Sequence, residues 1–285
     1  MIARASLQIV NAEQISPVSL SDGTTIPQLG FGVWQVPDDE AQPAVEEALR
    51  LGYRMIDTAQ MYQNEAGVGR AIAASGLKRD EVYVTTKVQN SNHGYDNVLR
   101  SYDESLQRLG VEVVDLLLIH WPLPSQDTYA DTWKALVHLK EQGQVRSIGV
   151  SNFHQPHLQR IIDETGIAPV INQVEMHPYL QQRQLRSVHA DLGIVTQSYS
   201  PLGSGKGLLE DPELAGLARD KGITAAQAVL AWHLAMGVVT IPKSVTPSRM
   251  EENLAAAVVQ LTTEEIERIN SLDRGTRFGG DPDRG

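Results

Sequence analysis

The sequence predicts an α/β protein built as a (β/α)8 TIM barrel, and three observations lead to this fold class. First, eight short apolar segments alternate along the chain with longer amphipathic segments. Second, the 285 residues of the chain suit a barrel, which typically needs about 250 residues in one domain. Third, an open doubly wound sheet would place a Gly-x-Gly-x-x-Gly turn after an early strand. The two nearest matches, at 30–32 and 67–69, lack the third glycine.

The predicted elements follow one another in a regular order. A β-hairpin is expected at about 17–29, because two short strand-like segments flank Asp22-Gly23, a pair typical of tight turns. The predicted strands then lie at 30–34, 54–57, 82–88, 114–120, 145–151, 170–175, 195–199 and 238–241. The predicted helices between and after them lie at 40–51, 66–75, 96–109, 129–142, 156–165, 182–192, 225–236 and 247–257. Two extra helices are predicted at 212–221 and 262–272.

These elements define a single domain over residues 1–285. Within it we expect the N-terminal hairpin at about 17–29, the barrel at about 30–257, and a C-terminal helix and short tail at about 258–285. The chain has no Pro- or Gly-rich linker that would separate two domains.

Composition excludes several classes of function. The chain has no cysteine, so disulfides, zinc thiolates and cysteine nucleophiles are ruled out. A net charge of −11 disfavours nucleic acid or an anionic membrane as a partner. No apolar run approaches the roughly 18 residues of a membrane span, and the first ten residues do not read as a signal peptide. We therefore expect a cytoplasmic enzyme.

Polar side chains stand where three successive apolar segments end. Asp57 ends the second predicted strand, Lys87 lies near the end of the third and His120 ends the fourth. Taken singly, each has an ordinary explanation: a helix cap, a solvated lysine and a half-buried histidine in a satisfied contact. In a barrel, however, the carboxyl ends of the strands meet at one mouth, where catalytic residues gather. We therefore expect these side chains and Tyr62, in the loop after Asp57, to form one site.

The chemistry of this set indicates proton transfer. A carboxylate buried at a strand end needs a partner, and Lys87 on the adjacent strand can form an ion pair with Asp57. The ammonium of Lys87 can then approach the Tyr62 hydroxyl, whose ordinary pKa of about 10 is too high for an efficient acid near neutral pH. A nearby cation favours the phenolate. We expect Lys87 to lower the pKa of Tyr62 and make it a proton donor to a carbonyl oxygen.

Several ordered motifs then identify a family resemblance that covers almost the whole chain. The first is the spacing Gly52-Tyr53-Arg54 … Asp57-Thr58-Ala59 … Tyr62 … Asn64-Glu65 … Gly69. The others are "HWP" at 120–122, "GVSNF" at 149–153, "INQVEMHP" at 171–178, "YSPLGSG" at 199–205 and "IPKSVTPSRMEEN" at 241–253. Together they resemble the aldo-keto reductases, and the short tail resembles the bacterial 2,5-diketo-D-gluconate reductase branch.

The resemblance implies an NADPH-dependent carbonyl reductase that binds its cofactor in a barrel. It implies a catalytic tetrad of Asp57, Tyr62, Lys87 and His120, in which His120 orients the substrate carbonyl. The cofactor-binding residues that it implies are Ser151, Asn152, Gln173, Tyr199, Ser200, Leu202, Ser204, Lys243, Ser244, Val245, Arg249, Glu252 and Asn253. Tyr199 would stack on the nicotinamide, and Lys243 and Arg249, near a helix start, would meet the adenosine 2′-phosphate of NADPH/NADP+.

The substrate is expected to be a small carbonyl compound, an α-dicarbonyl or a keto sugar, bound by a monomer. Trp34, Trp121 and Phe153 would wall an apolar pocket for it. No metal is expected, because His154 and His157 lack a third ligand in the sequence.

Two alternatives to a reductase stay open. One is a non-catalytic nicotinamide-binding regulatory module of the same fold. The other is a Schiff-base enzyme using Lys87, which would need a neutral lysine.

Overall fold

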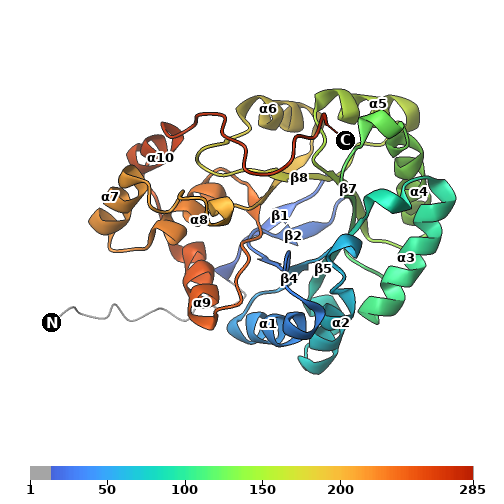
Figure 1. Cartoon of the computed structure of the whole chain (residues 1–285), viewed down its shortest axis with the longest axis horizontal. Helices are drawn as coiled ribbons and strands as arrows, with labels where there is room; N and C mark the ends of the chain where they lie inside the picture. The colour runs from blue at the N-terminus through green and yellow to red at the C-terminus, as the bar shows by residue number, and fades with distance from the viewer. Residues whose placement is uncertain (1–13, 285) are drawn as a thin grey trace.

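A computed structural model of the protein describes residues 14–284, in which eight parallel strands form one sheet with helices around it (Figure 1). Each strand lies beside its neighbour in the sequence, in the order β10-β9-β8-β7-β6-β5-β4-β3. The strands are β3 (Phe31–Gly32), β4 (Met55–Asp57), β5 (Tyr83–Val88), β6 (Leu116–Ile119), β7 (Ser147–Ser151), β8 (Ile171–Glu175), β9 (Val195–Tyr199) and β10 (Val239–Thr240). The predicted α/β class and the eight parallel strands are confirmed.

Helices connect successive strands and cover the outside of the sheet (Figure 1). They are α1 (Asp38–Leu51), α2 (Glu65–Ala74), α3 (Tyr95–Leu109), α4 (Tyr129–Glu141), α5 (Gln155–Thr165), α6 (Arg183–Leu192), α7 (Pro212–Lys221), α8 (Ala225–Ala235), α9 (Pro247–Ala255) and α10 (Thr263–Asn270). Short 3-10 turns are η2 (Gln60–Tyr62), η3 (Arg79–Glu81), η4 (Asn90–Asn92), η5 (Pro124–Gln126), η6 (Gly203–Gly205) and η7 (Ala256–Val258). Both α7 and α8 lie between β9 and β10 in the sequence.

Local signals in the sequence explain where several helices begin and end. The α7 helix starts after Asp211, whose side chain accepts a hydrogen bond from the N–H of Glu213, and it has Pro212 at its first position, where a missing N–H costs little. It ends at Gly222, which has a left-handed φ of 71° that glycine adopts without strain. The α3 helix buries Val98, Tyr102 and Leu109 on one face, the spacing of an amphipathic helix.

The N-terminal hairpin is also confirmed. It consists of β1 (Pro17–Ser19) and β2 (Thr25–Pro27), which pair antiparallel across the predicted Asp22-Gly23 turn. Its Leu20 and Ile26 belong to one apolar cluster with the strand residues Met55 and Leu116. The hairpin therefore covers the end of the sheet opposite to the carboxyl ends of the strands.

The sheet curls until its two outer strands, β3 and β10, meet. Parallel bridges pair Leu29 with Thr240 and Gly32 with Lys243, and the N–H of Gly30 donates to the carbonyl of Thr240 at 2.9 Å. These outer strands are two residues long each, shorter than predicted, because the pairing there consists of separate bridges and Pro242 has no N–H to extend it.

The remaining differences from prediction are at element ends. The helix predicted at 247–257 is α-helical only to Ala255 and continues as η7. Residues 1–13, for which no signal peptide was expected, and Gly285 lie outside the described residues. Within 14–284, no helix combines the length and the apolar character that crossing a bilayer requires.

Candidate active site

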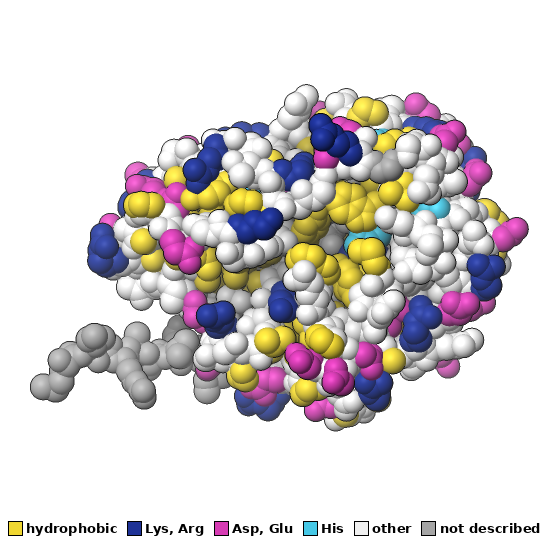
Figure 2. Space-filling view, in the orientation of Figure 1, with side chains coloured by type: hydrophobic (Ala, Val, Ile, Leu, Met, Phe, Trp, Pro, Cys, Tyr) yellow, Lys and Arg dark blue, Asp and Glu magenta, His cyan; other side chains and the backbone are white. Residues whose placement is uncertain are grey.

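Parallel register brings the predicted catalytic residues to the same edge of the sheet. Asp57 is the last residue of β4, Lys87 is the fifth of six residues in β5, and His120 follows β6 directly. Tyr62 ends the turn η2 that leaves β4. Figure 2 shows a hollow at the centre of the face that the C-terminal segment crosses, with hydrophobic side chains around it.

Asp57, Lys87 and Tyr62 form a continuous hydrogen-bonded chain. The Lys87 Nζ donates to Asp57 Oδ1, to the carbonyl oxygen of Thr58 at 3.0 Å and to the Tyr62 hydroxyl at 3.4 Å. Lys87 has no exposed surface and Asp57 is 2% exposed. All three acceptors are oxygens, so the site holds the ammonium by direct contact on each side. The predicted ion pair and the predicted approach of Lys87 to Tyr62 are both present.

Burial sets the directions of the pKa values in this chain. Burial raises the pKa of Asp57 and lowers that of Lys87, and the contact between the two groups opposes both changes. Burial, followed by the charge of Asp57, raises the pKa of Tyr62 well above 10. The expectation that Lys87 lowers the phenol pKa is therefore corrected for this structure. Asp57 compensates the charge of Lys87, so burial of the phenol dominates and Tyr62 stays protonated.

His120 lies beside this chain. Its ring contacts the Tyr62 ring edge-on, with centroids 5.6 Å apart, and it is 6% exposed. Burial, and then the charge of Lys87, lowers the pKa of His120 well below 6.5, so the imidazole is neutral. Its Nδ1 is buried without a hydrogen-bond partner among the described residues. A neutral ring next to a protonated phenol can orient an oxygen atom between them by hydrogen bonding.

The residues expected to bind the nicotinamide carboxamide are close together, and two of them, Asn152 and Gln173, contact residues of the tetrad. The Ser151 hydroxyl donates to the carbonyl of Gln173 at 2.8 Å, and the Asn152 amide donates to the carbonyl of His120 at 3.0 Å. The Tyr199 hydroxyl donates to Asn152 Oδ1 at 2.8 Å. The Gln173 amide donates to Asp57 Oδ2 at 2.7 Å, a contact that the sequence did not predict.

The predicted phosphate-binding residues lie on two segments, the turn after β9 and the start of α9. Ser200, Leu202 and Ser204 belong to the turn after β9, where Ser200 and Ser204 have positive φ angles of 49° and 52°. Lys243 and Arg249 flank the start of α9; both are exposed, and neither forms an ion pair with another described residue. In a chain of net charge −11, two uncompensated cations at a helix start favour an anionic ligand.

Two of the other residues predicted near the adenosine, Ser244 and Glu252, have protein partners of their own. The N–H of Thr246 donates to the Ser244 hydroxyl at 3.1 Å, and the Glu252 carboxylate accepts from the Thr224 hydroxyl at 2.7 Å. Val245 is 46% exposed, whereas Asn253 is 4% exposed.

The residues predicted to wall the pocket differ in how far they are exposed. Trp34 is 44% exposed and Trp121 is half-buried, so both can contact a ligand. Phe153 has no exposed surface and makes edge-on contacts with Tyr129 and His157 at 5.6 and 5.9 Å between ring centroids. Its assignment as a pocket wall is corrected: Phe153 packs into the core behind the sheet.

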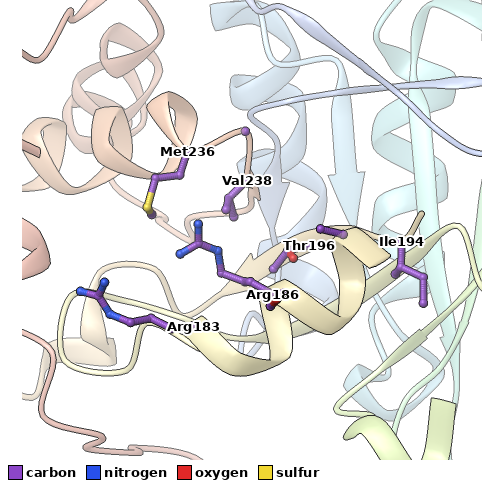
Figure 3. Close-up of a pocket in the computed structure, with 9 residues that line it drawn as sticks. Arg183, Arg186, Ile194, Thr196, Met236 and Val238 are labelled. Atoms are coloured by element: carbon purple, nitrogen blue, oxygen red, sulfur yellow. The ribbon is translucent and has the colours of Figure 1, made fainter. Parts of the chain in front are cut away.

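Two features lie away from this site. A surface pocket of about 530 Å³ is lined by α6 and the segment before β10, and Figure 3 shows Arg186 directed toward Val238 within it. None of its lining residues was predicted as a site residue. Elsewhere, Asp283 adds a carboxylate to the histidine pair, with its Oδ1 2.8 Å from His154 Nδ1. Among residues 14–284, however, no group of three or more His, Cys, Asp or Glu side chains could hold a metal ion.

Comparisons with known proteins agree with the motifs. The model of the Aldo/keto reductase family matches residues 27–274. The chain is 50% identical over 265 residues to an aldo-keto reductase of Mycolicibacterium smegmatis, covering 93% of this chain and 96% of that protein. It is 51% identical over 267 residues to methylglyoxal reductase DkgA of Yersinia pestis, with coverage of 93% and 96%. A crystal structure of a Gox0644 mutant in complex with NADPH has a TM-score of 0.91, 46% identity and coverage of 95% and 98%.

The eight-stranded parallel sheet and the polar groups at its carboxyl edge define a protein of the α/β class with its site at the strand ends. The family model spans most of the chain and the relatives match along nearly all of it. The chain therefore belongs to the aldo-keto reductase family.

Proposed function

We propose that this protein reduces aldehydes and ketones to alcohols with NADPH, using Tyr62 as the proton donor. The observation that carries the proposal is the chain from Asp57 through Lys87 to the Tyr62 hydroxyl, with the neutral His120 ring at its end. It lies at the carboxyl ends of β4, β5 and β6, beside the hollow of the sheet.

The protein residues have separate tasks in this reaction. His120 and the Tyr62 hydroxyl hold the carbonyl oxygen, and Tyr62 gives its proton to that oxygen as the alcohol forms. The phenolate left behind faces the Lys87 ammonium 3.4 Å away, which stabilises its negative charge. Asp57 and the carbonyl of Thr58 keep this ammonium charged and directed. NADPH, when bound, supplies the hydride that reduces the carbonyl carbon.

The residues present fit such a cofactor. Amide side chains of Asn152 and Gln173 both donate and accept hydrogen bonds, as a carboxamide requires. Tyr199 is held by its bond to Asn152 and would stack on the nicotinamide. Lys243 and Arg249, which are exposed and have no ionic partner within residues 14–284, would meet the 2′-phosphate. The pyrophosphate region would take Ser200, Leu202 and Ser204, and the adenosine region would take Ser244, Val245, Glu252 and Asn253.

The names of the relatives indicate a class of substrate. Several proteins that match along nearly the whole chain are named methylglyoxal reductase. We propose small α-dicarbonyl compounds as substrates, with other aldehydes and keto sugars as further candidates, in a pocket bounded by Trp34 and Trp121.

We also propose how the chain is organised. It forms one domain over 1–285, with a hairpin at about 17–29, a closed (β/α)8 barrel at about 30–257, and a C-terminal helix and tail at about 258–285. The meeting of β3 with β10 supports closure, and α7 and α10 are additions to the repeating pattern. The protein acts as a cytoplasmic monomer that binds no nucleic acid and no membrane.

The structure weighs against a Schiff-base enzyme, and turnover distinguishes the reductase from a regulatory module. A Schiff-base lysine must reach a substrate carbonyl, but Lys87 has no exposed surface and three oxygen acceptors surround its ammonium. Trapping with borohydride in the presence of substrate should therefore leave the mass of the protein unchanged. A purely regulatory module would bind NADPH without turning over any carbonyl.

The decisive experiment is Tyr62→Phe, assayed by NADPH oxidation with methylglyoxal. Loss of a general acid costs about 10²–10⁴-fold in rate, so turnover should fall by that factor while NADPH still quenches tryptophan fluorescence at the same concentrations. Tyr95→Phe is the matched control, because Tyr95 is 38% exposed on α3 and its ring contacts His138, which is not a tetrad residue. Near-normal turnover in folded Tyr62→Phe would remove Tyr62 from the role of proton donor.

A further inference from the structure

A buried pair of ionisable residues at the end of β8 has no part in the proposed chemistry. Glu175 is the last residue of β8 and is 1% exposed, and His177, two residues later, has no exposed surface. His177 Nε2 lies 2.9 Å from Glu175 Oε1. Burying a carboxylate is costly unless hydrogen bonds compensate its charge, so the remaining partners of Glu175 indicate what this pair does.

Those partners are in the C-terminal segment 275–284, which we call the strap. The N–H of Phe278 donates to Glu175 Oε1 at 2.6 Å, and the N–H of Gly279 donates to Oε2 at 2.7 Å. Each carboxylate oxygen thus binds one of two successive backbone donors. The Phe278 ring stacks on His177, with centroids 4.7 Å apart and planes 25° apart. The side chain and the backbone of the strap are therefore both held by this pair.

Further hydrogen bonds hold the strap before this contact and beside it. Before it, the N–H of Thr276 donates to the carbonyl of Tyr179 at 2.9 Å. Beside it, Lys206 Nζ donates to the carbonyl of Phe278 at 2.9 Å, which links the strap to the loop after β9. Figure 1 shows the strap running from α10 across the face of the sheet toward α5.

The strap passes directly over the proposed pocket residue Trp121 and over Tyr199, the residue proposed to stack on the nicotinamide. A Cβ atom added to Gly279 would lie 2.8 Å from Glu175 Oε2 and 3.6 Å from the Tyr199 hydroxyl oxygen. A Cβ atom added to Gly280 would lie 3.2 Å from the Trp121 ring. Glycine at these positions lets the backbone approach both aromatic side chains closely, and the position of the strap therefore sets the height of the space above them.

We propose that Glu175 is a positioning residue that fixes the strap as the roof of the substrate pocket. The inference rests on the proposed function, since that function makes Trp121 a boundary of the substrate pocket and stacks Tyr199 on the nicotinamide. Burial acts to raise the pKa of Glu175, but the bonds from His177 and from the N–H groups of Phe278 and Gly279 lower it below its ordinary value. The carboxylate therefore stays charged near neutral pH, and the strap stays docked.

Trypsin tests the docking without any measurement of activity. Arg277 lies inside the strap, with its Nη1 4.0 Å from Glu175 Oε2 and 22% of its side chain exposed, so cleavage after it reports how often this part of the strap leaves Glu175. Glu175→Gln keeps the size of the side chain but leaves one oxygen to accept from two N–H donors. Losing one charge-assisted bond should increase the open population, and with it the cleavage rate, by about tenfold or more.

The matched control is Asp115→Asn. Asp115 is also a buried carboxylate that accepts a backbone bond, from the N–H of Val84 at 2.8 Å, but it precedes β6 at the opposite end of the sheet. Its substitution should leave cleavage after Arg277 unchanged while both variants are folded by circular dichroism. A wild-type cleavage rate in folded Glu175→Gln, or equal acceleration in both variants, would overturn the proposal.

Steady-state kinetics tests whether the strap bounds the substrate pocket. A chain ending at Gly275 should show a raised KM for methylglyoxal, and Glu175→Gln should move KM toward that value while the Kd for NADPH stays unchanged. In the truncated chain, Glu175→Gln should have no further effect on KM. A wild-type KM in the truncated chain would refute the claim that the strap bounds the substrate pocket. A Glu175→Gln effect on KM that persists without the strap would show that Glu175 acts on Tyr199 directly. If wild-type protein turns over no carbonyl, the proposed function fails, and the trypsin result still decides whether Glu175 holds the strap.

Discussion

Arg249 lies exposed near the start of α9, and replacing it with alanine tests the proposed preference for NADPH over NADH. NADPH differs from NADH by a 2′-phosphate that adds about two negative charges near neutral pH. Arg249 can bind this group with a planar pair of donors, and Lys243 adds a compact charge on the other side of the helix start. Neither cation has an ionic partner within residues 14–284, so neither must give up a salt bridge when a phosphate binds.

The magnitude follows from these contacts. A hydrogen bond to a charged group contributes about 1.5–3 kcal/mol net, and the lower end applies here because the side chain is exposed and screened by solvent. A loss near 1.4 kcal/mol is about tenfold in affinity. Arg249→Ala should therefore weaken NADPH about tenfold and leave NADH nearly unchanged. Lower salt should widen the wild-type preference, since the Debye length grows from about 8 Å near physiological salt to about 30 Å at 0.01 M.

Titration of each cofactor, followed by quenching of tryptophan fluorescence, measures both affinities. Arg219→Ala is a suitable control, because Arg219 is an exposed arginine at the end of α7, away from the α9 start. Equal losses for NADPH and NADH in Arg249→Ala would show that Arg249 supports α9 or a shared part of the cofactor, and the phosphate assignment would be refuted.

Two further predictions concern charge inside the fold. Lys87→Met removes the cation that faces the Tyr62 hydroxyl, so turnover should fall and the alkaline limb of kcat should move to higher pH; an unchanged profile would assign Lys87 a structural role only. Burial lowers the pKa of His189 from its ordinary 6.5 to about 4, so the folded protein loses stability as the pH falls below about 6.5. Between about pH 7 and about pH 4.5, His189→Gln should lose about 2 kcal/mol less unfolding free energy than wild type in urea titrations. Equal losses in His189→Gln and in wild type would contradict the assignment to His189.

Local pattern was enough to predict most of the elements. The α7 helix has the predicted bounds, because Asp211-Pro212 marks its start and Gly222 marks its end. The outer strands β3 and β10 were predicted too long. Apolar residues continue past the last paired residue, and the extent of a ladder depends on a partner strand that is distant in sequence.

The site was predictable where a residue type stands out at a strand end, as Asp57, Lys87 and His120 do. It was not predictable where the partner is a backbone group or is far along the chain. The Thr58 carbonyl that binds Lys87 carries no signal in the residue type, and Gln173 lies 116 positions from Asp57. The raised pKa of Tyr62 depends on burial, which the sequence around it does not specify.

The bond from Gln173 to Asp57 Oδ2 has a consequence for measurement. In the proposed complex the same amide side chain faces the nicotinamide carboxamide, so one residue contacts both the cofactor and the carboxylate that holds Lys87. Coupling between two binding events is reciprocal: if cofactor binding changes the proton affinity of the Asp57–Lys87 pair by some factor, the protonation of that pair changes the cofactor affinity by the same factor. Where this coupling exists, the pH dependence of NADPH affinity contains a contribution from the ionisation of this buried pair, in addition to that of the 2′-phosphate, and it can be measured without substrate or turnover.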